Sequence, residues 1–99
     1  MNQHLSTTES RIASKLIKNL LDAGFWLSVY DGEETVLRHS RNAHAIFDSL
    51  GPAEQDYIRV HTMQGENSRW VTVGWFHLVY GNDEDVISDC SSSVAHYAS

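Results

Sequence analysis

The chain is poor in cysteine and in proline. Its 99 residues include one cysteine, Cys90, and one proline, Pro52. A single cysteine excludes an intramolecular disulfide framework and a zinc site built on several cysteines, and it suits a reducing compartment. Stability must therefore come from a packed core, and a chain of this length buries roughly two-thirds of its unfolded surface.

Long apolar runs and an excess of positive charge are also missing. The first ten residues are polar and carry no apolar segment of a secretory signal. No run approaches the roughly 20 apolar residues of a membrane span, so we expect a cytoplasmic protein with no membrane partner. The chain has seven basic and thirteen acidic residues, which gives a net charge of −6. A protein that binds the nucleic-acid backbone carries a basic stripe, so the composition argues against a nucleic-acid partner.

The first structural signal is an amphipathic helix. Ser6 and Glu9 match a capping box, in which each side chain accepts a hydrogen bond from the backbone of the other residue. The apolar residues that follow recur at helical spacing and form one stripe: Ile12, Leu16, Ile17, Leu20 and Leu21. Gly24 is suited to end the helix because glycine adopts the left-handed conformation at no cost.

Five later segments have the composition of β-strands: 25–30, 33–39, 57–63, 70–80 and 86–90. Asp31 and Gly32 predict a two-residue turn between the first two strands, which places Leu27 opposite Val36 and Trp26 opposite Leu37. Between the second and third strands, Ser40 is expected to cap a second, shorter helix that ends at Gly51 and Pro52.

This order of elements, α-β-β-α-β-β-β, predicts one α+β domain over residues 1–91. We expect two layers, with two helices on an antiparallel five-stranded sheet. The serine-rich residues 92–99 are expected to form a flexible C-terminal tail. The strand order across the two hairpins stays open.

Both faces of this sheet are predicted to be apolar. A turn centred on Glu66 and Asn67 pairs Ile58 with Trp75, Val60 with Val73 and Thr62 with Val71, and this face would take the helices. The opposite face would carry Tyr57 paired with Phe76, and the full set that we predict as an interaction face is Tyr57, Met63, Trp70, Phe76 and Tyr80. Exposed aromatic patches usually mark interaction sites. The alternative is that the tail or a helix covers this face.

One pair of residues has catalytic character. His77 and Asp89 lie opposite each other if the last turn is centred on Asp83, and a carboxylate beside an imidazole is half of a catalytic triad. No activated serine context such as Gly-x-Ser-x-Gly accompanies it, so a cross-strand polar pair is the simpler interpretation. The six histidines have no metal-ligand spacing. We therefore predict no catalytic residue, no metal site and no cofactor.

Gly74, in the middle of the longest strand, predicts a β-bulge or a close approach by another backbone, opposite Arg59. The stretch around it, Val73 to Asp83 followed by Val86 to Asp89, resembles a set of small bacterial and phage- or plasmid-borne proteins. These proteins share the pattern Gly-Trp-x-x-Leu-Val-Tyr-Gly-Asn-Asp…Val-Ile-Ser-Asp. The similarity extends over residues 15–90 and includes 23–34. It implies no reaction, because the group has no established activity, and it assigns no functional residue. This chain departs from the pattern at Cys90, where an aromatic residue is expected.

Two functional hypotheses follow. The favoured one is a non-catalytic protein-interaction module that forms a homodimer or docks on a host protein through the aromatic face. The alternative is a small enzyme or ligand-binding protein with its site near His77, Asp89 and the loop 81–85, where histidine and carboxylates would supply acid–base chemistry.

Overall fold

The structure, a computed structural model, describes residues 2–66, 68–82 and 84–98. It confirms the predicted order of elements: α1 (Thr7–Asp22), β1 (Trp26–Tyr30), β2 (Thr35–Ser40), α2 (Ala43–Asp48), β3 (Gln55–Gln64), β4 (Arg69–Val79) and β5 (Ile87–Cys90). A short 3-10 helix, η1 (Ala95–Ala98), follows. Asn67 and Asp83, which the sequence places at two turn centres, lie outside the described residues.

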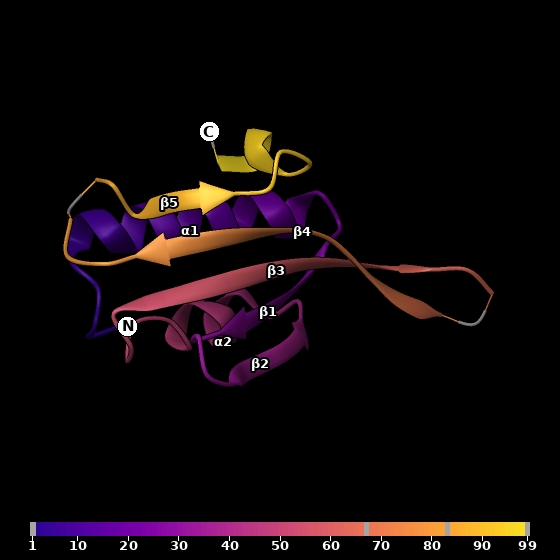
Figure 1. The fold of residues 1–99 in the computed structure, drawn as a ribbon, viewed down its shortest axis with the longest axis horizontal. Helices are drawn as coiled ribbons and strands as arrows, with labels where there is room; N and C mark the ends of the chain where they lie inside the picture. Colours follow the sequence, from indigo (N-terminus) through magenta and orange to yellow (C-terminus); the bar gives the residue numbers. More distant parts are fainter. Residues whose placement is uncertain (1, 67, 83, 99) are drawn as a thin grey trace.

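The five strands form one antiparallel sheet in the order β2-β1-β3-β4-β5. The two hairpins are therefore joined by pairing of β1 with β3, which settles the strand order that the sequence left open. Both helices lie behind the sheet in Figure 1, and no helix lies on the near side among the described residues. The β3–β4 hairpin is longer than its neighbours and extends beyond the rest of the sheet (Figure 1).

The helix α1 begins and ends as predicted. The Ser6 hydroxyl accepts a hydrogen bond from the Glu9 backbone N–H at 3.1 Å, and the Glu9 carboxylate accepts one from the Ser6 N–H at 2.9 Å. Glu9 also accepts a bond of 2.6 Å from the Gly81 N–H, which ties the start of α1 to the loop after β4. These backbone bonds, Ser6 foremost, hold the pKa of Glu9 below its usual value. Past the last turn, Gly24 adopts a φ of 93°.

The first hairpin differs from its prediction. The Asp31 carboxylate accepts hydrogen bonds from the N–H groups of Glu33 and Glu34, both at 2.8 Å, and this local turn lengthens the connection. The longer turn pairs Tyr30 with Thr35, and two irregularities in the β1–β2 ladder shift the pairing further, so that Leu27 pairs with Ser40. The predicted partnerships of Leu27 with Val36 and Trp26 with Leu37 are therefore wrong. The cap of α2 is also displaced: it is Asn42, whose side chain accepts from the Ala45 N–H, while Ser40 belongs to β2.

The second hairpin is correct near its tip and shifted by one residue in its body. Thr62 pairs with Val71 and Met63 with Trp70, as predicted. A bulge then follows, because β4 has one more residue than β3 between the pairs His61–Thr72 and Val60–Gly74. Beyond the bulge Ile58 pairs with Phe76 and Arg59 with Trp75, so the predicted pairs Ile58–Trp75, Val60–Val73 and Tyr57–Phe76 are wrong. The bulge exchanges the faces of Trp75 and Phe76.

Residues after Cys90 pack against the domain, which corrects the expectation of a flexible tail. Val94 is 1% exposed and belongs to the core. An ideal Cβ on Gly74 would lie 2.6 Å from a methyl carbon of Val94 and 2.7 Å from the Ser91 hydroxyl. The close approach predicted at Gly74 is therefore real, but side chains of the C-terminal segment make it, and Gly74 pairs with Val60 and not with Arg59. The Tyr97 ring packs edge-on against Phe25, at 5.5 Å between centroids.

Candidate functional site

The sheet face opposite the helices is the largest candidate surface. We call it the open face, and define it by the strand positions that alternate with the core residues and share cross-strand pairs. These are Trp26, Ser28 and Tyr30 of β1; Thr35 of β2; Gln55, Tyr57, Arg59, His61 and Met63 of β3; Trp70, Thr72, Trp75, His77 and Val79 of β4; and Asp89 of β5. The described C-terminal segment packs on the helix side, against the position of a Gly74 Cβ, and does not cover this face.

The chain distributes its aromatic residues unevenly between the two faces. All three tryptophans lie on the open face, whereas all three phenylalanines belong to the core or pack against it. Trp70 is 38% exposed and Trp75 36% exposed, and Met63, the cross-strand partner of Trp70, is 43% exposed. Trp, Tyr and Met are enriched at protein interfaces, and Trp and Tyr can bury an apolar body while keeping a polar atom partnered.

Four rings form a cluster at the point where the β3–β4 hairpin extends beyond β1. The rings of His39 and Trp70 are stacked, with centroids 4.0 Å apart and planes at 5°. Trp26 meets Trp70 edge-on at 5.3 Å, and His61 meets His39 edge-on at 4.8 Å. His39 has a left-handed backbone, φ 44°, which is uncommon for a residue with a side chain. Its backbone N–H is held by the Ser28 hydroxyl at 3.0 Å, so the strained residue is fixed where its ring covers Trp70.

His61 is the buried member of this cluster. Its Nε2 is 2.9 Å from the Ser28 hydroxyl oxygen, and its Nδ1 is 3.0 Å from the Thr72 hydroxyl oxygen. Burial lowers the pKa of His61, and the charges of His39 and Arg59 lower it further. A serine beside an imidazole resembles a nucleophile with its base, but Ser28 is buried and the second ring nitrogen meets a hydroxyl where a triad has a carboxylate. The arrangement supports the surface cluster structurally.

A second aromatic group occupies the centre of the open face. The rings of Tyr57 and His77 are stacked at 4.4 Å and 6°, and Tyr30 lies 6.1 Å from Tyr57. The Arg59 guanidinium lies over the Tyr30 ring at 4.5 Å, in the geometry of a cation–π contact. Asp89 is the one acidic residue at a described strand position of this face.

The open face contains part of the interaction face that the sequence predicted. Tyr57, Met63 and Trp70 lie on it. Phe76 is fully buried among the core residues, because the bulge rotates it to the helix side. Tyr80 follows β4 and packs against the core, with its hydroxyl donating to Asp56 at 2.7 Å. The sequence analysis missed Trp75, whose position depends on the same bulge.

The predicted alignment of His77 with Asp89 is confirmed, because the two residues are cross-strand partners. Their side chains have other partners: His77 Nε2 lies 2.7 Å from the Gln55 amide oxygen, and the Asp89 carboxylate accepts from the Cys90 N–H. Neither residue lines the cavity of about 720 Å³ at the end of the sheet. Among the described residues, no serine, threonine or cysteine side chain is hydrogen-bonded to His77 or Asp89.

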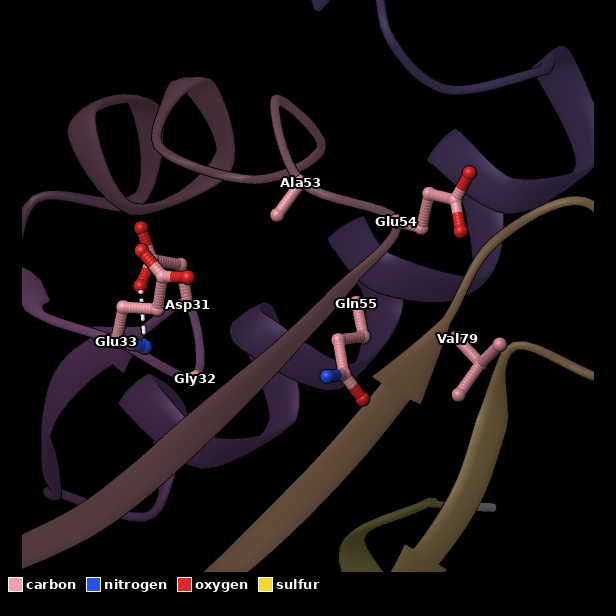
Figure 2. Close-up of a pocket in the computed structure, with 7 residues that line it drawn as sticks. All are labelled: Asp31, Gly32, Glu33, Ala53, Glu54, Gln55 and Val79. Atoms are coloured by element: carbon pink, nitrogen blue, oxygen red, sulfur yellow. Dashed lines mark hydrogen bonds between the residues drawn. The ribbon is translucent and has the colours of Figure 1, made fainter.

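A cavity lies at the end of the sheet where the β1–β2 turn meets the start of β3. It measures about 720 Å³, and Figure 2 shows carboxylates of Asp31 and Glu33 on one side of it and that of Glu54 on another. A smaller cavity of about 190 Å³ shares Asp31 and Ala53 with it and is lined also by Glu34 and Asp56. Arg, Lys and His are absent from the described residues that line the two cavities.

Comparison with family models, with curated proteins and with solved structures finds no match to the chain in any of the three. Of the helices that the structure describes, none has both the length and the apolar character needed to cross a membrane.

Proposed function

We propose that the protein is a non-catalytic interaction module whose open face binds another protein chain, and that this chain is a second copy of itself. The observation that carries the proposal is the uncovered sheet face with all three tryptophans on it. The core of the domain is complete on the helix side, with the described C-terminal segment included, so these tryptophans are not needed to close it.

The dimensions of the molecule are compatible with a homodimer. Its broad side measures 42 by 25 Å, and an interface of standard size, about 800 Å² on each partner, fits within these dimensions. The charge distribution supports it as well. Two chains of net charge −6 repel each other, but Asp89 is the one carboxylate at a described strand position of this face, so face-to-face packing keeps most negative charge at the outside of the dimer.

The test is the molar mass in solution, by size-exclusion chromatography with light scattering over a concentration series. We expect a dimer of twice the 11.2 kDa chain mass, weakened about 30-fold by Trp75→Ser or by Arg59→Glu, since truncation of an interface hot spot costs about 2 kcal/mol. Arg11→Glu, on an exposed position of α1, is the matched control for added negative charge and should leave the dimer intact.

The tryptophans provide a second measurement. Because all three lie on the open face, dissociation on dilution should shift the tryptophan emission to longer wavelength in the same concentration range in which the mass falls. A chain that stays monomeric at every concentration, or a dimer that Arg11→Glu weakens as much as Arg59→Glu, would refute self-association through this face.

A further inference from the structure

The open face carries one cation and one anion, and neither is paired with an opposite charge among the described residues. Arg59 is the one lysine or arginine at the described strand positions of this face, Asp89 is the one acidic residue, and both are exposed. The Arg59 guanidinium lies over the Tyr30 ring at 4.5 Å and has no ion pair within the described chain. The Asp89 carboxylate accepts a hydrogen bond from the N–H of the next residue, Cys90, at 2.8 Å. The face therefore presents one unpaired charge of each sign.

The register of the sheet keeps these two charges apart within one chain. Arg59 on β3 pairs with Trp75 on β4. Asp89 on β5 pairs with His77, which lies two residues further along β4. Strands about 4.8 Å apart, with a rise of about 3.3 Å per residue, place the Cα atoms of Arg59 and Asp89 about 12 Å apart. A second copy of the same face supplies each charge with its opposite.

Two-fold symmetry turns this separation into a specific arrangement. In a symmetric interface, if Arg59 contacts Asp89 of the partner subunit, then Asp89 contacts the partner's Arg59. When two such faces pack against each other, the two-fold axis passes over the midpoint between Arg59 and Asp89 on each face. Their cross-strand partners place this midpoint on β4, between Trp75 and His77.

The residues at this midpoint suit the centre of an interface. Trp75 is one of the four most exposed large apolar residues of the described chain. The His77 ring is stacked on that of Tyr57, with planes at 6°. Aromatic hot spots lie near the centre of interfaces, and charged pairs around them fix the register more than they add affinity. The exposed tryptophan and the two unpaired charges are separate observations, and both select the same centre.

We propose that the homodimer has its two-fold axis over β4, between Trp75 and His77, and that two reciprocal ion pairs join Arg59 of each chain to Asp89 of the partner subunit. This inference rests on the proposed function, because it specifies the geometry of that dimer. The pairs decide how the two aromatic faces are aligned, and each completes a charge that has no partner in the single chain.

An exchange of charge between the two positions tests this arrangement. Arg59→Glu and Asp89→Lys should each weaken their own homodimer about 30-fold at low ionic strength, because each opposes like charges at both pairs. A mixture of the two variants should form a heterodimer about as stable as the unaltered dimer, since both pairs again join opposite charges. Native mass spectrometry distinguishes the heterodimer by its mass.

The matched control is a mixture of Arg59→Glu with Glu84→Lys, which changes the net charge as Asp89→Lys does but lies in the loop after β4. This mixture retains Asp89 in both chains, so one of its two pairs still opposes like charges. Its heterodimer should be weaker than the heterodimer of Arg59→Glu with Asp89→Lys. Equal stability of the two heterodimers would overturn the reciprocal pairs, because overall charge would then explain the restoration.

Cross-linking locates the axis without a charge reversal. A short bis-maleimide should link two His77→Cys chains, because both copies of this position lie beside the axis. It should not link Met63→Cys chains, whose two copies would be about 25 Å apart by the same strand spacings. Cys90 packs against the core and is present in both variants, so the unaltered chain is the blank.

The outcomes separate this geometry from the proposed function. A dimer that Trp75→Ser weakens but that the mixed charge variants do not restore would overturn the reciprocal pairs and leave self-association through the open face standing. Linking of Met63→Cys without linking of His77→Cys would overturn the position of the axis in the same way. A chain that stays monomeric at every concentration would overturn both proposals.

Discussion

Substitution of Gly74 by alanine tests the packing of the C-terminal segment. In an open strand this change is favourable by about 0.5–1 kcal/mol, because glycine loses more backbone freedom on folding than alanine. In this structure the new Cβ would lie 2.6 and 2.7 Å from the two γ-methyl carbons of Val94. Overpacking of a core costs about 1–3 kcal/mol, so we expect Gly74→Ala to lower the free energy of unfolding by about 1–2 kcal/mol after the gain is subtracted.

The same contact makes the substitution correctable. Val94→Ala alone removes two buried methyl groups, at about 0.8 kcal/mol each, and should lower the free energy of unfolding by about 1.5–2.5 kcal/mol. It also removes two of the three atoms that the Gly74→Ala methyl would meet, and leaves the Ser91 hydroxyl oxygen at 2.7 Å. Gly74→Ala should therefore cost less in the Val94→Ala chain than in the native chain, and the double-mutant cycle should show a coupling of about 1 kcal/mol.

Urea denaturation at 25 °C measures all four corners of this cycle. If residues 91–98 formed a flexible tail, Gly74→Ala would raise the free energy of unfolding, Val94→Ala would leave it unchanged, and the coupling would be zero. The two descriptions thus differ in the sign of a single-site effect. A stabilising Gly74→Ala substitution would refute the packing described for Val94.

Other predictions concern protonation and capping. The pKa of His61 is lowered in the folded chain from 6.5, so the unfolded chain binds the proton more tightly, and the free energy of unfolding should fall as the pH drops below about 6.5; His61→Gln should flatten that part of the profile in urea titrations at different pH. The pKa of Glu9 is lowered from 4.5, so its contribution is complete above that pH and is lost as the pH falls through the folded value. Glu9→Gln should remove this acid-sensitive part, with a cost at pH 7 of about 0.5–2 kcal/mol typical of a lost cap; an unchanged acid limb would contradict the bond to Gly81.

Local signals in the sequence were sufficient for the elements. The capping box of Ser6 and Glu9 involves residues three apart, and the apolar stripe of α1 repeats within two turns, so both can be read without knowing the fold. The alternation of the strands and the glycine-containing turns likewise gave five strands in the correct order. Each of these features depends on a few neighbouring residues, which is why sequence reasoning reached them.

The register depends on information that is not local. The bulge at Val73 arises where β4 meets both β3 and the C-terminal segment, and Gly74 allows Val94 to approach at that point. Counting back from the hairpin tip cannot reveal an extra residue six positions away. The error moved Phe76 to the wrong face and removed Trp75 from the candidate surface, so one misplaced residue altered the predicted interface more than any helix or strand boundary did.

The prediction of a two-residue turn after β1 was wrong for a different reason. Asp31 and Gly32 are typical of a two-residue turn, but the Asp31 carboxylate binds two backbone N–H groups further along, and this interaction stabilises a longer loop. The longer loop carries Glu33 and Glu34 to the cavities at the end of the sheet. The side chain of one aspartate thus lengthens the turn and positions two carboxylates, while two irregularities in the β1–β2 ladder complete the shift of register.

Two surfaces of the chain differ in their chemistry, and this difference offers a test of the proposed dimer that needs no substitution. The open face has aromatic rings with Arg59 among them, whereas the cavities have five carboxylates and no lining cation among the described residues. Aromatic packing is weakly screened by salt and is strengthened by sulfate, but attraction between exposed charges is largely lost near 1 M ionic strength, where the Debye length is about 3 Å. Dimerisation through the open face should therefore persist or tighten in concentrated sodium sulfate. An association that weakened in this solution would depend on exposed charges and not on the tryptophans.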